Sequence, residues 1–251
     1  MGLQNKVCII TGGGSGIGRA SALMMAKAGA KVVPVGRTLS KVEEVAKEIE
    51  SSGGTVMPIG LDVADIDGVK KMVKDVFDTY GRIDVLVNNA GHSSPHRMLL
   101  TTTPEDIQNV INSNLIGTIY CTQAVIPSMR EAKEGTIINI SSLAGVSPGL
   151  LAGMAYGAAK AAVNNFTAFL NSEYRNTGIR ASVVIPGEVD TPIMNKRPIV
   201  PSDEAKATMV TAEDIAEAIL LIASLPQRAS ITELIIRPTY LRDTSAETGV
   251  A

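Results

Sequence analysis

The stretch Val7-Cys8-Ile9-Ile10-Thr11-Gly12-Gly13-Gly14-Ser15-Gly16-Ile17-Gly18 decides the fold of this chain. An apolar run with strand character leads into a glycine-rich turn, and a helical pattern begins directly after it. Glycines allow a tight turn and let a phosphate group approach the backbone. The free N–H groups and positive end of a helix N-terminus attract the same anion. The stretch therefore predicts the first strand–turn–helix unit of a dinucleotide-binding sheet, and a plain glycine turn is the alternative.

The same alternation of short apolar runs and longer helical patterns continues along the whole chain. Repeated βα alternation is typical of a parallel sheet covered by helices on both faces, and it explains why the strands are almost entirely apolar. We expect strands over Val7–Thr11, Lys31–Gly36, Val56–Leu61, Asp84–Asn88, Thr136–Ser141, Arg180–Ile185 and Ile231–Arg237, and helices over 17–29, 39–52, 66–80, 105–131, 155–177 and 211–224. The sequence thus predicts an α/β fold, a Rossmann-type doubly wound seven-stranded parallel sheet, in a single domain over residues 1–251.

Two prolines lie inside these predicted strands. Proline has no backbone N–H to donate to a neighbouring strand, so within sheets it favours edges. Pro58 fits an edge strand. Pro34 fits a strand inside the sheet poorly, unless its nitrogen faces no partner.

Composition excludes several classes of protein. A net charge of −2 and 3% aromatic residues give neither the basic surface nor the stacking side chains of a nucleic-acid-binding protein. No apolar run reaches membrane-spanning length. The N-terminal residues run directly into a strand, so we expect no signal peptide. Cys8 and Cys121 read as buried thiols, and we expect a cytoplasmic protein. His92 and His96 read as loop residues, and we expect no metal site.

The end of the second predicted strand favours one nicotinamide cofactor over the other. An acidic residue about 20 positions after the glycines would bind the ribose 2′-hydroxyl of NAD. Gly36 occupies that position, and the next acid is Glu43. Arg37 instead offers a fork of donors that suits a phosphate. The sequence therefore favours NADP(H) over NAD(H), unless Arg37 is a solvated charge.

Asp62 and Val63 follow the third predicted strand. The Asp62 carboxylate is placed to accept a hydrogen bond from an adenine amino group, with the Val63 backbone beside it. An aspartate that caps the next helix explains the position equally well.

Tyr156-Gly157-Ala158-Ala159-Lys160 brings a phenol and an ammonium group to one helix face, one turn apart. A free tyrosine titrates near ~10, so ionisation at neutral pH needs a shift of about 3 units, or roughly 4 kcal/mol. A nearby lysine acts in that direction because an opposite charge favours the phenolate, and a cationic cofactor would add to the effect. The pair predicts a proton-transfer device, although surface neighbours with no role show the same spacing.

Further motifs follow in order along nearly the whole chain: Thr11–Gly18, Asp62-Val63, Asn88-Asn89-Ala90-Gly91, Asn114, Ser141-Ser142, Tyr156–Lys160 and Pro186-Gly187. Together they resemble the short-chain dehydrogenase/reductase superfamily, in its single-domain branch.

The resemblance implies a catalytic role for four residues. Tyr156 would be the acid/base that exchanges a proton with the substrate oxygen, and Lys160 would lower its pKa and bind the nicotinamide ribose. Ser142 would hydrogen-bond the carbonyl oxygen. We prefer Ser142 to Ser141 because it directly precedes the loop, and strand neighbours point to opposite sides. Asn114 would hold a main-chain kink and a water that links Lys160 to solvent.

The resemblance also implies a cofactor site at the ends of the strands. The residues expected to contact the cofactor are Gly12, Ser15, Gly16, Ile17, Gly18, Arg37, Asp62, Val63, Asn89, Ala90, Gly91, Tyr156, Lys160, Pro186, Gly187, Val189 and Thr191. Asn89 to Gly91 would line the adenosine ribose and the nicotinamide. Pro186 to Thr191 would hold the nicotinamide carboxamide and the phosphates.

The implied function is an NADP(H)-dependent oxidoreductase that interconverts a small-molecule carbonyl and a secondary alcohol by hydride transfer, with tyrosine as acid/base. Reduction of a 3-oxoacyl thioester is an alternative within enzymes, and a non-catalytic NADP(H)-binding regulator is an alternative outside them. The family's dimer faces correspond to helices 105–131 and 155–177, so we expect a homodimer or homotetramer.

Three loops are expected to shape the substrate pocket: 92–100, 143–154 and 192–208. The last has three prolines and mixed charge, and its position after Thr191 suits a substrate lid. Lys196 and Arg197 in this segment either meet an anionic substrate or are solvated charges, and we favour solvated charges.

Overall fold

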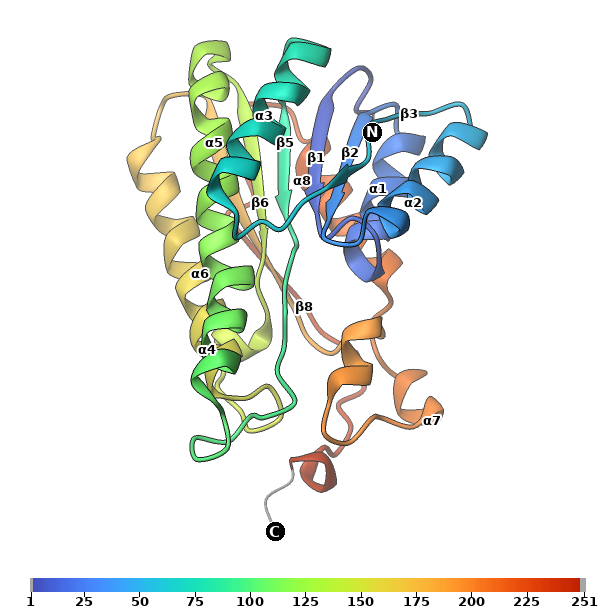
Figure 1. The fold of residues 1–251 in the computed structure, drawn as a ribbon, viewed down its shortest axis with the longest axis vertical. Helices are drawn as coiled ribbons and strands as arrows, with labels where there is room; N and C mark the ends of the chain where they lie inside the picture. The colour runs from blue at the N-terminus through green and yellow to red at the C-terminus, as the bar shows by residue number, and fades with distance from the viewer. Residues whose placement is uncertain (1, 249–251) are drawn as a thin grey trace.

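One parallel sheet organises the chain, and the structure, a computed structural model, describes residues 2–248 (Figure 1). Its strands are β1 (Val7–Thr11), β2 (Lys31–Gly36), β3 (Thr55–Val56), β4 (Ile59–Gly60), β5 (Val85–Asn88), β6 (Gly135–Ile140), β7 (Ile179–Pro186) and β8 (Glu233–Ile236). They lie in the order β3-β2-β1-β5-β6-β7-β8, and β4 also pairs with β2. The predicted Rossmann-type parallel sheet is confirmed, with its third strand in two pieces.

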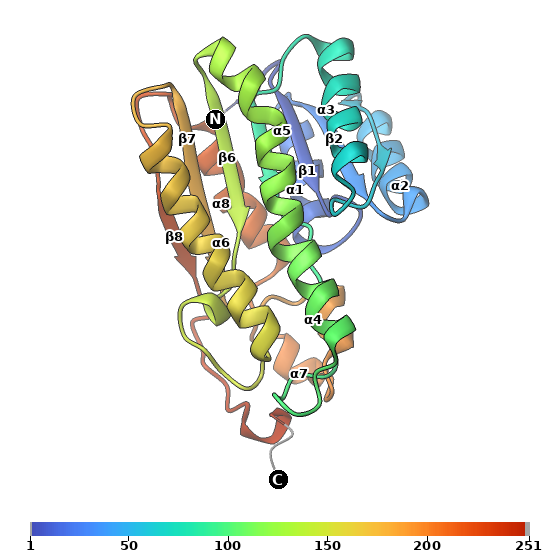
Figure 2. The ribbon, with the colours of Figure 1, turned by 60° about the vertical axis from the view of Figure 1, so that its left-hand side comes forward.

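Helices cover both faces of this sheet. They are α1 (Gly16–Lys27), α2 (Leu39–Ser51), α3 (Ile66–Tyr80), α4 (Pro104–Ile111), α5 (Gly117–Ala132), α6 (Met154–Glu173), α7 (Asp203–Lys206) and α8 (Ala212–Ser224). Figures 1 and 2 show α3, α5 and α6 on one side of the sheet and α1 and α8 on the other. Among the described residues, no helix is both long enough and apolar enough to cross a membrane.

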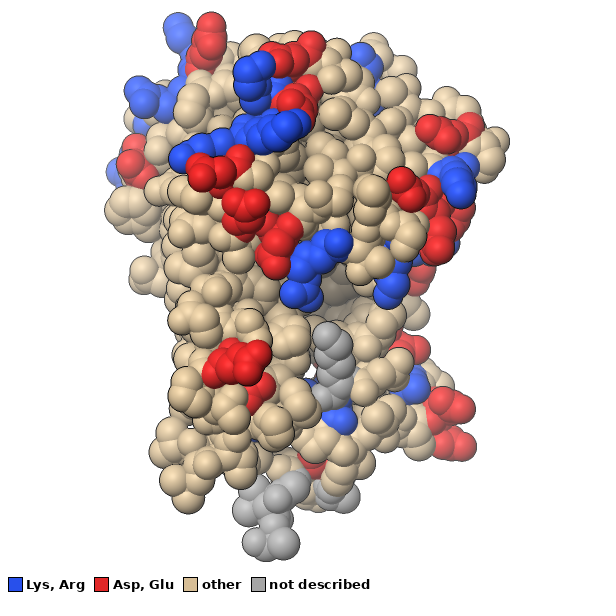
Figure 3. Space-filling view, in the orientation of Figure 1, with Lys and Arg blue, Asp and Glu red and all other residues tan. Residues whose placement is uncertain are grey.

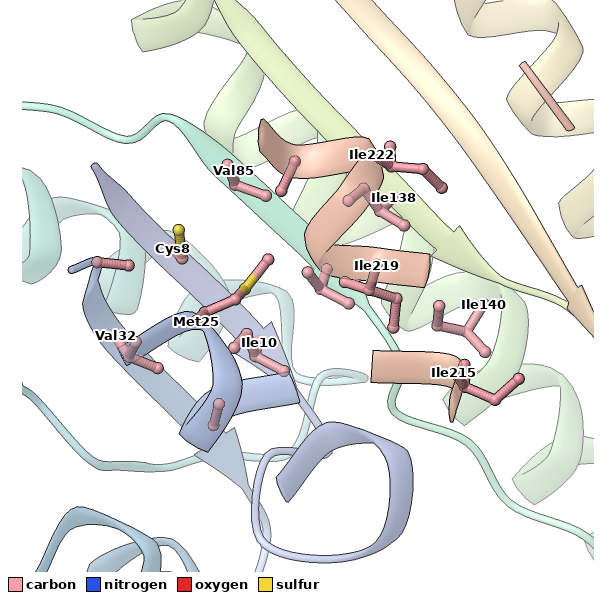
Figure 4. Close-up of a cluster of buried hydrophobic side chains, with 14 of the residues drawn as sticks. Cys8, Ile10, Met25, Val32, Val85, Ile138, Ile140, Ile215, Ile219 and Ile222 are labelled. Atoms are coloured by element: carbon pink, nitrogen blue, oxygen red, sulfur yellow. The ribbon is translucent and has the colours of Figure 1, made fainter. Parts of the chain in front are cut away.

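Each face of the sheet has its own hydrophobic core. Successive side chains of a strand point to opposite faces, so Cys8 and Ile10 of β1 pack with α1 and α8 (Figure 4). Val7 and Ile9 of the same strand pack with α3 and α5 on the other face. Burying one such side chain completely contributes about 1.5–3 kcal/mol. The continuous apolar strands of the sequence therefore reflect burial on both sides.

The two prolines are accommodated by a break in the third strand. The single strand expected over Val56–Leu61 is wrong, because pairing stops around Pro58 and leaves β3 and β4 as separate segments. The carbonyls of Val32 and Gly36 on β2 accept hydrogen bonds from this segment. Pro34 lies midway between them and so faces the same neighbour, at the break. Its missing N–H therefore interrupts no pairing.

The expectation of one continuous helix over 105–131 is also wrong. A π-helical turn, Asn112–Ile116, separates α4 from α5. The side-chain amide of Asn114 donates to the carbonyl oxygens of Val110 at 2.8 Å and of His92 at 2.7 Å. These bonds stabilise the widened turn, a feature often found at functional sites.

The strand order places a crevice at one end of the sheet. The chain winds outward in opposite directions from the neighbouring strands β1 and β5, and ligands of such sheets bind outside the carboxyl ends at this switch point. Figure 1 shows the segments that follow β5, β6 and β7 gathered at that end, together with the C-terminal segment. The fold thus assembles loops from distant parts of the chain around one site.

Candidate active site

A cavity of about 390 Å³ opens at the carboxyl end of the sheet. The predicted site residues on its wall are Gly12, Ser15, Gly16, Ile17, Asn89, Gly91, Asn114, Ser142, Tyr156, Lys160, Pro186, Gly187, Val189 and Thr191. An adjoining hollow is lined by Arg37, Asp62, Val63 and Ala90 and shares part of the glycine turn. Figure 3 shows basic side chains beside a hollow in the middle of one face, where charges of both signs are otherwise mixed. The structure therefore gathers nearly all the predicted residues in one continuous site.

Gly18 is the exception, since it lines neither hollow. A Cβ atom at Gly18 would lie 2.2 Å from the carbonyl oxygen of Gly12, so no side chain fits there. Gly18 therefore lets the helix lie against the turn, and its contact with the cofactor stays a prediction.

The glycine turn depends on backbone shapes that other residues rarely adopt. Gly12 and Gly16 have φ angles of +66° and +50°, in the left-handed region that favours glycine. The side-chain amide of Asn89 donates to the carbonyl oxygens of Thr11 at 3.0 Å and Gly12 at 3.3 Å. Asn89 therefore ties the turn to the end of β5.

The start of α1 is suited to an anion. Ser15 precedes the first helical residue, and its side chain caps no N–H group of the first turn among the described residues. The first N–H groups of a helix otherwise need a partner. The start of this helix beside a glycine turn fits the pyrophosphate of a nicotinamide dinucleotide.

Basic side chains mark the far end of the cofactor groove. Arg37 and Lys41 both line the second hollow, and the Arg37 guanidinium lies 4.0 Å from the Asp62 carboxylate. Asp62 accepts from the N–H of Ala64, while Asp65 caps α3, so a helix-capping role for Asp62 is wrong. Lys41 was not predicted, although a second cation four positions after Arg37 is a readable signal.

The lysine of the predicted pair is almost fully buried. Its side chain is 4% exposed, and its Nζ donates to the carbonyl oxygen of Ile140 at 2.8 Å. Nζ also lies 5.5 Å from the centroid of the Tyr156 ring. Burial lowers the pKa of Lys160 to about 8, because the ammonium ion loses hydration.

Burial and neighbouring groups act in opposite directions on the pKa of Tyr156. Burial raises the pKa of Tyr156, and this outweighs three opposing influences: a hydrogen bond from Ser142 and the charges of Arg97 and Arg197. In the chain without a cofactor, the pKa of Tyr156 therefore lies above its ordinary value. The lowering expected from Lys160 stays a prediction.

The two neighbouring serines have separate tasks. The Ser141 hydroxyl donates to the carbonyl oxygen of Lys160 at 3.1 Å and so faces the backbone of α6. Ser142 lies in contact with the Tyr156 phenol and accepts a 3.2 Å hydrogen bond from the N–H of Ala144. The geometry thus separates the two as strand alternation predicts.

Asn114 is fully buried at the base of the cavity. Its amide nitrogen serves the π turn, while its Oδ1 has no hydrogen-bond partner among residues 2–248. A Cβ atom at Gly91 would lie 2.8 Å from this oxygen. The site therefore needs glycine at position 91.

Two arginines, Arg97 and Arg197, line the cavity beside Tyr156. Arg197 is paired with Glu188 at 2.8 Å, and its side chain is 10% exposed, so the expectation of a solvated charge is wrong. The side chain of Lys196 lies outside the described residues. Arg97 was not predicted to bind anything, because no motif surrounds it in its loop; it lines the same cavity as Tyr156.

The two histidines have other surroundings. His96 shares a 2.9 Å contact between its Nδ1 and the Asp106 carboxylate, and the carbonyl oxygen of His92 accepts from Asn114. Within residues 2–248, no three histidine, cysteine, aspartate or glutamate side chains come together in a way that would hold a metal ion.

Known proteins share both the sequence and the fold. A family profile described as short chain dehydrogenase matches residues 6–199. A 3-oxoacyl-[acyl-carrier-protein] reductase, FabG of Thermotoga maritima, is 38% identical over 89% of this chain and 92% of its own length. A metagenomic short-chain oxidoreductase in complex with NADP is 33% identical, with a TM-score of 0.82 over 95% of this chain and 99% of its own. A serine dehydrogenase complexed with NADP+ is 29% identical, with a TM-score of 0.85 over 95% and 97%.

The chain belongs to the short-chain dehydrogenase/reductase family. It is an oxidoreductase with the Rossmann-type fold of that family, whose members bind nicotinamide cofactors.

Proposed function

We propose that this short-chain dehydrogenase/reductase interconverts a carbonyl group and a secondary alcohol with NADP(H) as cofactor. One observation carries the proposal: Asn114, Ser142, Tyr156 and Lys160 converge on one cavity wall beside the glycine turn. Such a reaction needs a proton donor, a hydrogen-bond donor for the substrate oxygen and a groove for the dinucleotide.

Tyr156 carries the proton transfer in this proposal. When bound, the nicotinamide supplies the hydride to the carbonyl carbon in reduction or accepts it in oxidation. The Tyr156 phenol gives its proton to the substrate oxygen in reduction and takes one back in oxidation. Ser142 holds that oxygen beside the phenol. The charges of Arg97 and Arg197 favour the phenolate that remains.

Lys160 positions the cofactor ribose and supports the phenolate. Its ammonium group already has one fixed partner, the carbonyl oxygen of Ile140, so its direction is set before any ligand binds. Asn114 holds the π turn against Gly91 and, in this proposal, a water between Lys160 and solvent. These are the roles that the resemblance implied.

NADP(H) is the proposed cofactor because of Arg37 and Lys41. Both line the hollow beside the glycine turn, and no carboxylate occupies position 36, where NAD-binding sheets use one. Two solved relatives carry NADP, and this supports the same choice.

A 3-oxoacyl thioester is the second candidate substrate, because the relative from Thermotoga maritima bears that activity in its name. A non-catalytic regulator is disfavoured, since all four catalytic side chains are present. Segment 192–208, which includes η3 (Pro192–Lys196) and α7, is the proposed substrate lid: its first residues line the cavity.

We also propose a cytoplasmic homodimer or homotetramer. Cys8 and Cys121 are free buried thiols, which fits a reducing compartment. Phe169 on α6 and Ile107 on α4 are partly exposed, on the helices expected to form the dimer faces. Light scattering of the purified protein measures the assembly directly.

The proposed reaction is tested by titrating the protein with NADPH and NADH and then following oxidation of the tighter one. The substrates are a panel of ketones, aldehydes and 3-oxoacyl thioesters. Tighter NADPH binding with turnover of a carbonyl compound supports the proposal. Turnover of thioesters alone selects the second candidate, and cofactor binding without turnover of any compound contradicts both.

A further inference from the structure

Among residues 2–248, two arginines are buried, and they differ in how many of their N–H groups have an acceptor. Arg180 is 7% exposed and Arg97 is 9% exposed. Arg180 donates to five acceptors: the Thr136 hydroxyl and four carbonyl oxygens that end α8 and the loop after it. Because a guanidinium has five N–H groups, Arg180 is fully satisfied. It is a structural arginine.

Arg97 makes only three such bonds. It donates to the carbonyl oxygen of Ser94 at 3.1 Å, to the Ser93 hydroxyl at 3.3 Å, and to the carbonyl oxygen of Leu151. Two of its five N–H groups have no acceptor among the described residues. No carboxylate within residues 2–248 pairs with it, although Asp106 accepts from Ser94 on the same loop. A buried cation without an anion is costly unless a ligand supplies the charge.

The surroundings of Arg97 place this unpaired charge beside the reaction centre. Arg97 lines the cavity that also contains Tyr156, and the two are close enough for the guanidinium to lower the pKa of the phenol. The groups that accept hydrogen bonds from Arg97 come from two separate loops, 92–100 and 143–154. Its position is therefore fixed before substrate arrives.

The other charged groups on the cavity wall leave this charge uncompensated. Glu188 is the only carboxylate lining the cavity among the described residues. It is held by Arg197 at 2.8 Å and by Arg242 at 2.7 Å. Glu247 completes a cluster of two acids and two arginines, which is neutral as a whole. Arg97 and Lys160 remain as the excess positive charge.

We propose that Arg97 binds a carboxylate of the substrate, so that the enzyme acts on oxo acids and the corresponding hydroxy acids. A carboxylate has two oxygens that match two N–H groups of a guanidinium. The bond would fix one end of the substrate while its carbonyl oxygen meets Tyr156 and Ser142. This inference rests on the proposed function and names the substrate class of the same site.

The test uses substrates that differ only in the acid end. Reduction by NADPH is measured for 2-oxobutanoate and 3-oxobutanoate, for the methyl ester of each, and for the N-acetylcysteamine thioester of 3-oxobutanoate. In the wild-type enzyme we expect kcat/KM for one of the acids to exceed that of its ester at least tenfold. Removing a charge-assisted hydrogen bond typically costs about 10- to 100-fold. Arg97→Gln should therefore lower kcat/KM for that acid by this factor and for its ester by less than about threefold.

Two further variants separate charge from loop structure. Arg97→Lys keeps the positive charge and should recover part of the activity on the acid that Arg97→Gln loses. Arg175→Gln removes a charge from an exposed residue away from the cavity and should leave the preference for the acid unchanged. Equal loss of activity on the acid and its ester in Arg97→Gln would show that Arg97 only holds its two loops, and would overturn the proposal.

A measurement on the wild-type enzyme covers the case in which Arg97→Gln does not fold. Butanoate should inhibit turnover of the methyl ester competitively, and butanamide should not. Equal inhibition by the two would overturn the carboxylate site. Turnover of the ester or thioester in preference to both acids would do the same while leaving the proposed carbonyl chemistry intact. Failure of every compound on the wider carbonyl panel would instead contradict the proposed function itself.

Discussion

The Nζ of Lys160 lies 5.5 Å from the centroid of the Tyr156 ring and is held there by the carbonyl oxygen of Ile140. The separation from the ring follows from the helix, since the two residues are one turn apart on α6. The hydrogen bond of 2.8 Å follows from the position of Ile140 at the end of β6. The ammonium group is therefore fixed between the sheet and the phenol. At this buried position the ammonium group loses its hydration, and this loss lowers the pKa of Lys160 to about 8.

Lys160→Met should separate stability from function. A buried ammonium ion with a lowered pKa destabilises the folded state. We therefore expect Lys160→Met to be more stable than wild type, with a free energy of unfolding about 1–3 kcal/mol larger at pH 7. Its reductase activity should be lost. Thermal unfolding and steady-state kinetics on the same preparations check the two effects.

The extra stability of Lys160→Met over wild type should decrease as the pH rises. Between a folded pKa of about 8 and the ordinary value of 10.5, the unfolded chain binds more protons at Lys160 than the folded chain. Wild-type stability from this group therefore rises with pH across that window. The difference between Lys160→Met and wild type should shrink from pH 7 to pH 10, and a difference that grows would contradict the account of Lys160.

Arg37→Leu should weaken NADPH binding and spare NADH binding. The lost contact with a phosphate is partly exposed to solvent, so the expected effect is about tenfold in Kd for NADPH, equivalent to about 1.4 kcal/mol. Lys41→Met should act in the same direction. Lys47→Met is the matched control, because Lys47 is an exposed residue of α2, the helix that carries Lys41. Equal weakening of both cofactors would mean that Arg37 supports the groove rather than recognises the 2′-phosphate.

Asp84 anchors the start of β5 to β1. Its carboxylate is 6% exposed and accepts from the N–H of Val7 at 2.8 Å and from the Lys6 ammonium at 3.1 Å. Burial acts to raise the pKa of Asp84, but its hydrogen bonds, including those from Arg82, outweigh this and lower it. We expect Asp84→Asn to cost about 2 kcal/mol of unfolding free energy at pH 7.

Because the folded pKa of Asp84 is lowered, its contribution is present above the unfolded pKa of about 3.9 and is lost as the pH falls through the folded value. Urea unfolding should therefore show a smaller gap between Asp84→Asn and wild type at pH 3 than at pH 7. Asp78→Asn, which removes an exposed pairing with Lys74, should change stability by less than about 0.5 kcal/mol. A gap of the same size at both pH values would refute the role given to the ionised Asp84.

The sequence predicted most of the sheet because burial on both faces leaves continuous apolar strands. It also predicted which residues meet at the carboxyl end, since parallel strands bring their ends together. The break around Pro58 escaped prediction because it depends on how Pro34 faces its neighbour. The resemblance implied a main-chain kink at Asn114, but its form as a π turn was not predicted, because it involves the contact between Asn114 and His92, which are distant in sequence.

The substrate end was the least predictable part. Arg97 lies in a loop without a motif, and its importance appears only when burial and hydrogen bonds are counted. Arg197 was predicted to be a solvated charge because neither of its partners is a near neighbour in sequence. Glu188 is 9 residues away and Glu247 is 50 residues away. Pairing between distant charges has no local pattern that a single sequence displays.

The most direct test of the proposed chemistry is Tyr156→Phe, which removes one hydroxyl from the cavity wall. Loss of general acid–base catalysis typically lowers turnover about 10²- to 10⁴-fold. Turnover of the best carbonyl substrate should fall by at least this much, while Kd for NADPH stays within about threefold of wild type. Tyr174→Phe, at the far end of α6, should leave turnover unchanged. Near-normal turnover by Tyr156→Phe would contradict the assignment of Tyr156 as the acid/base.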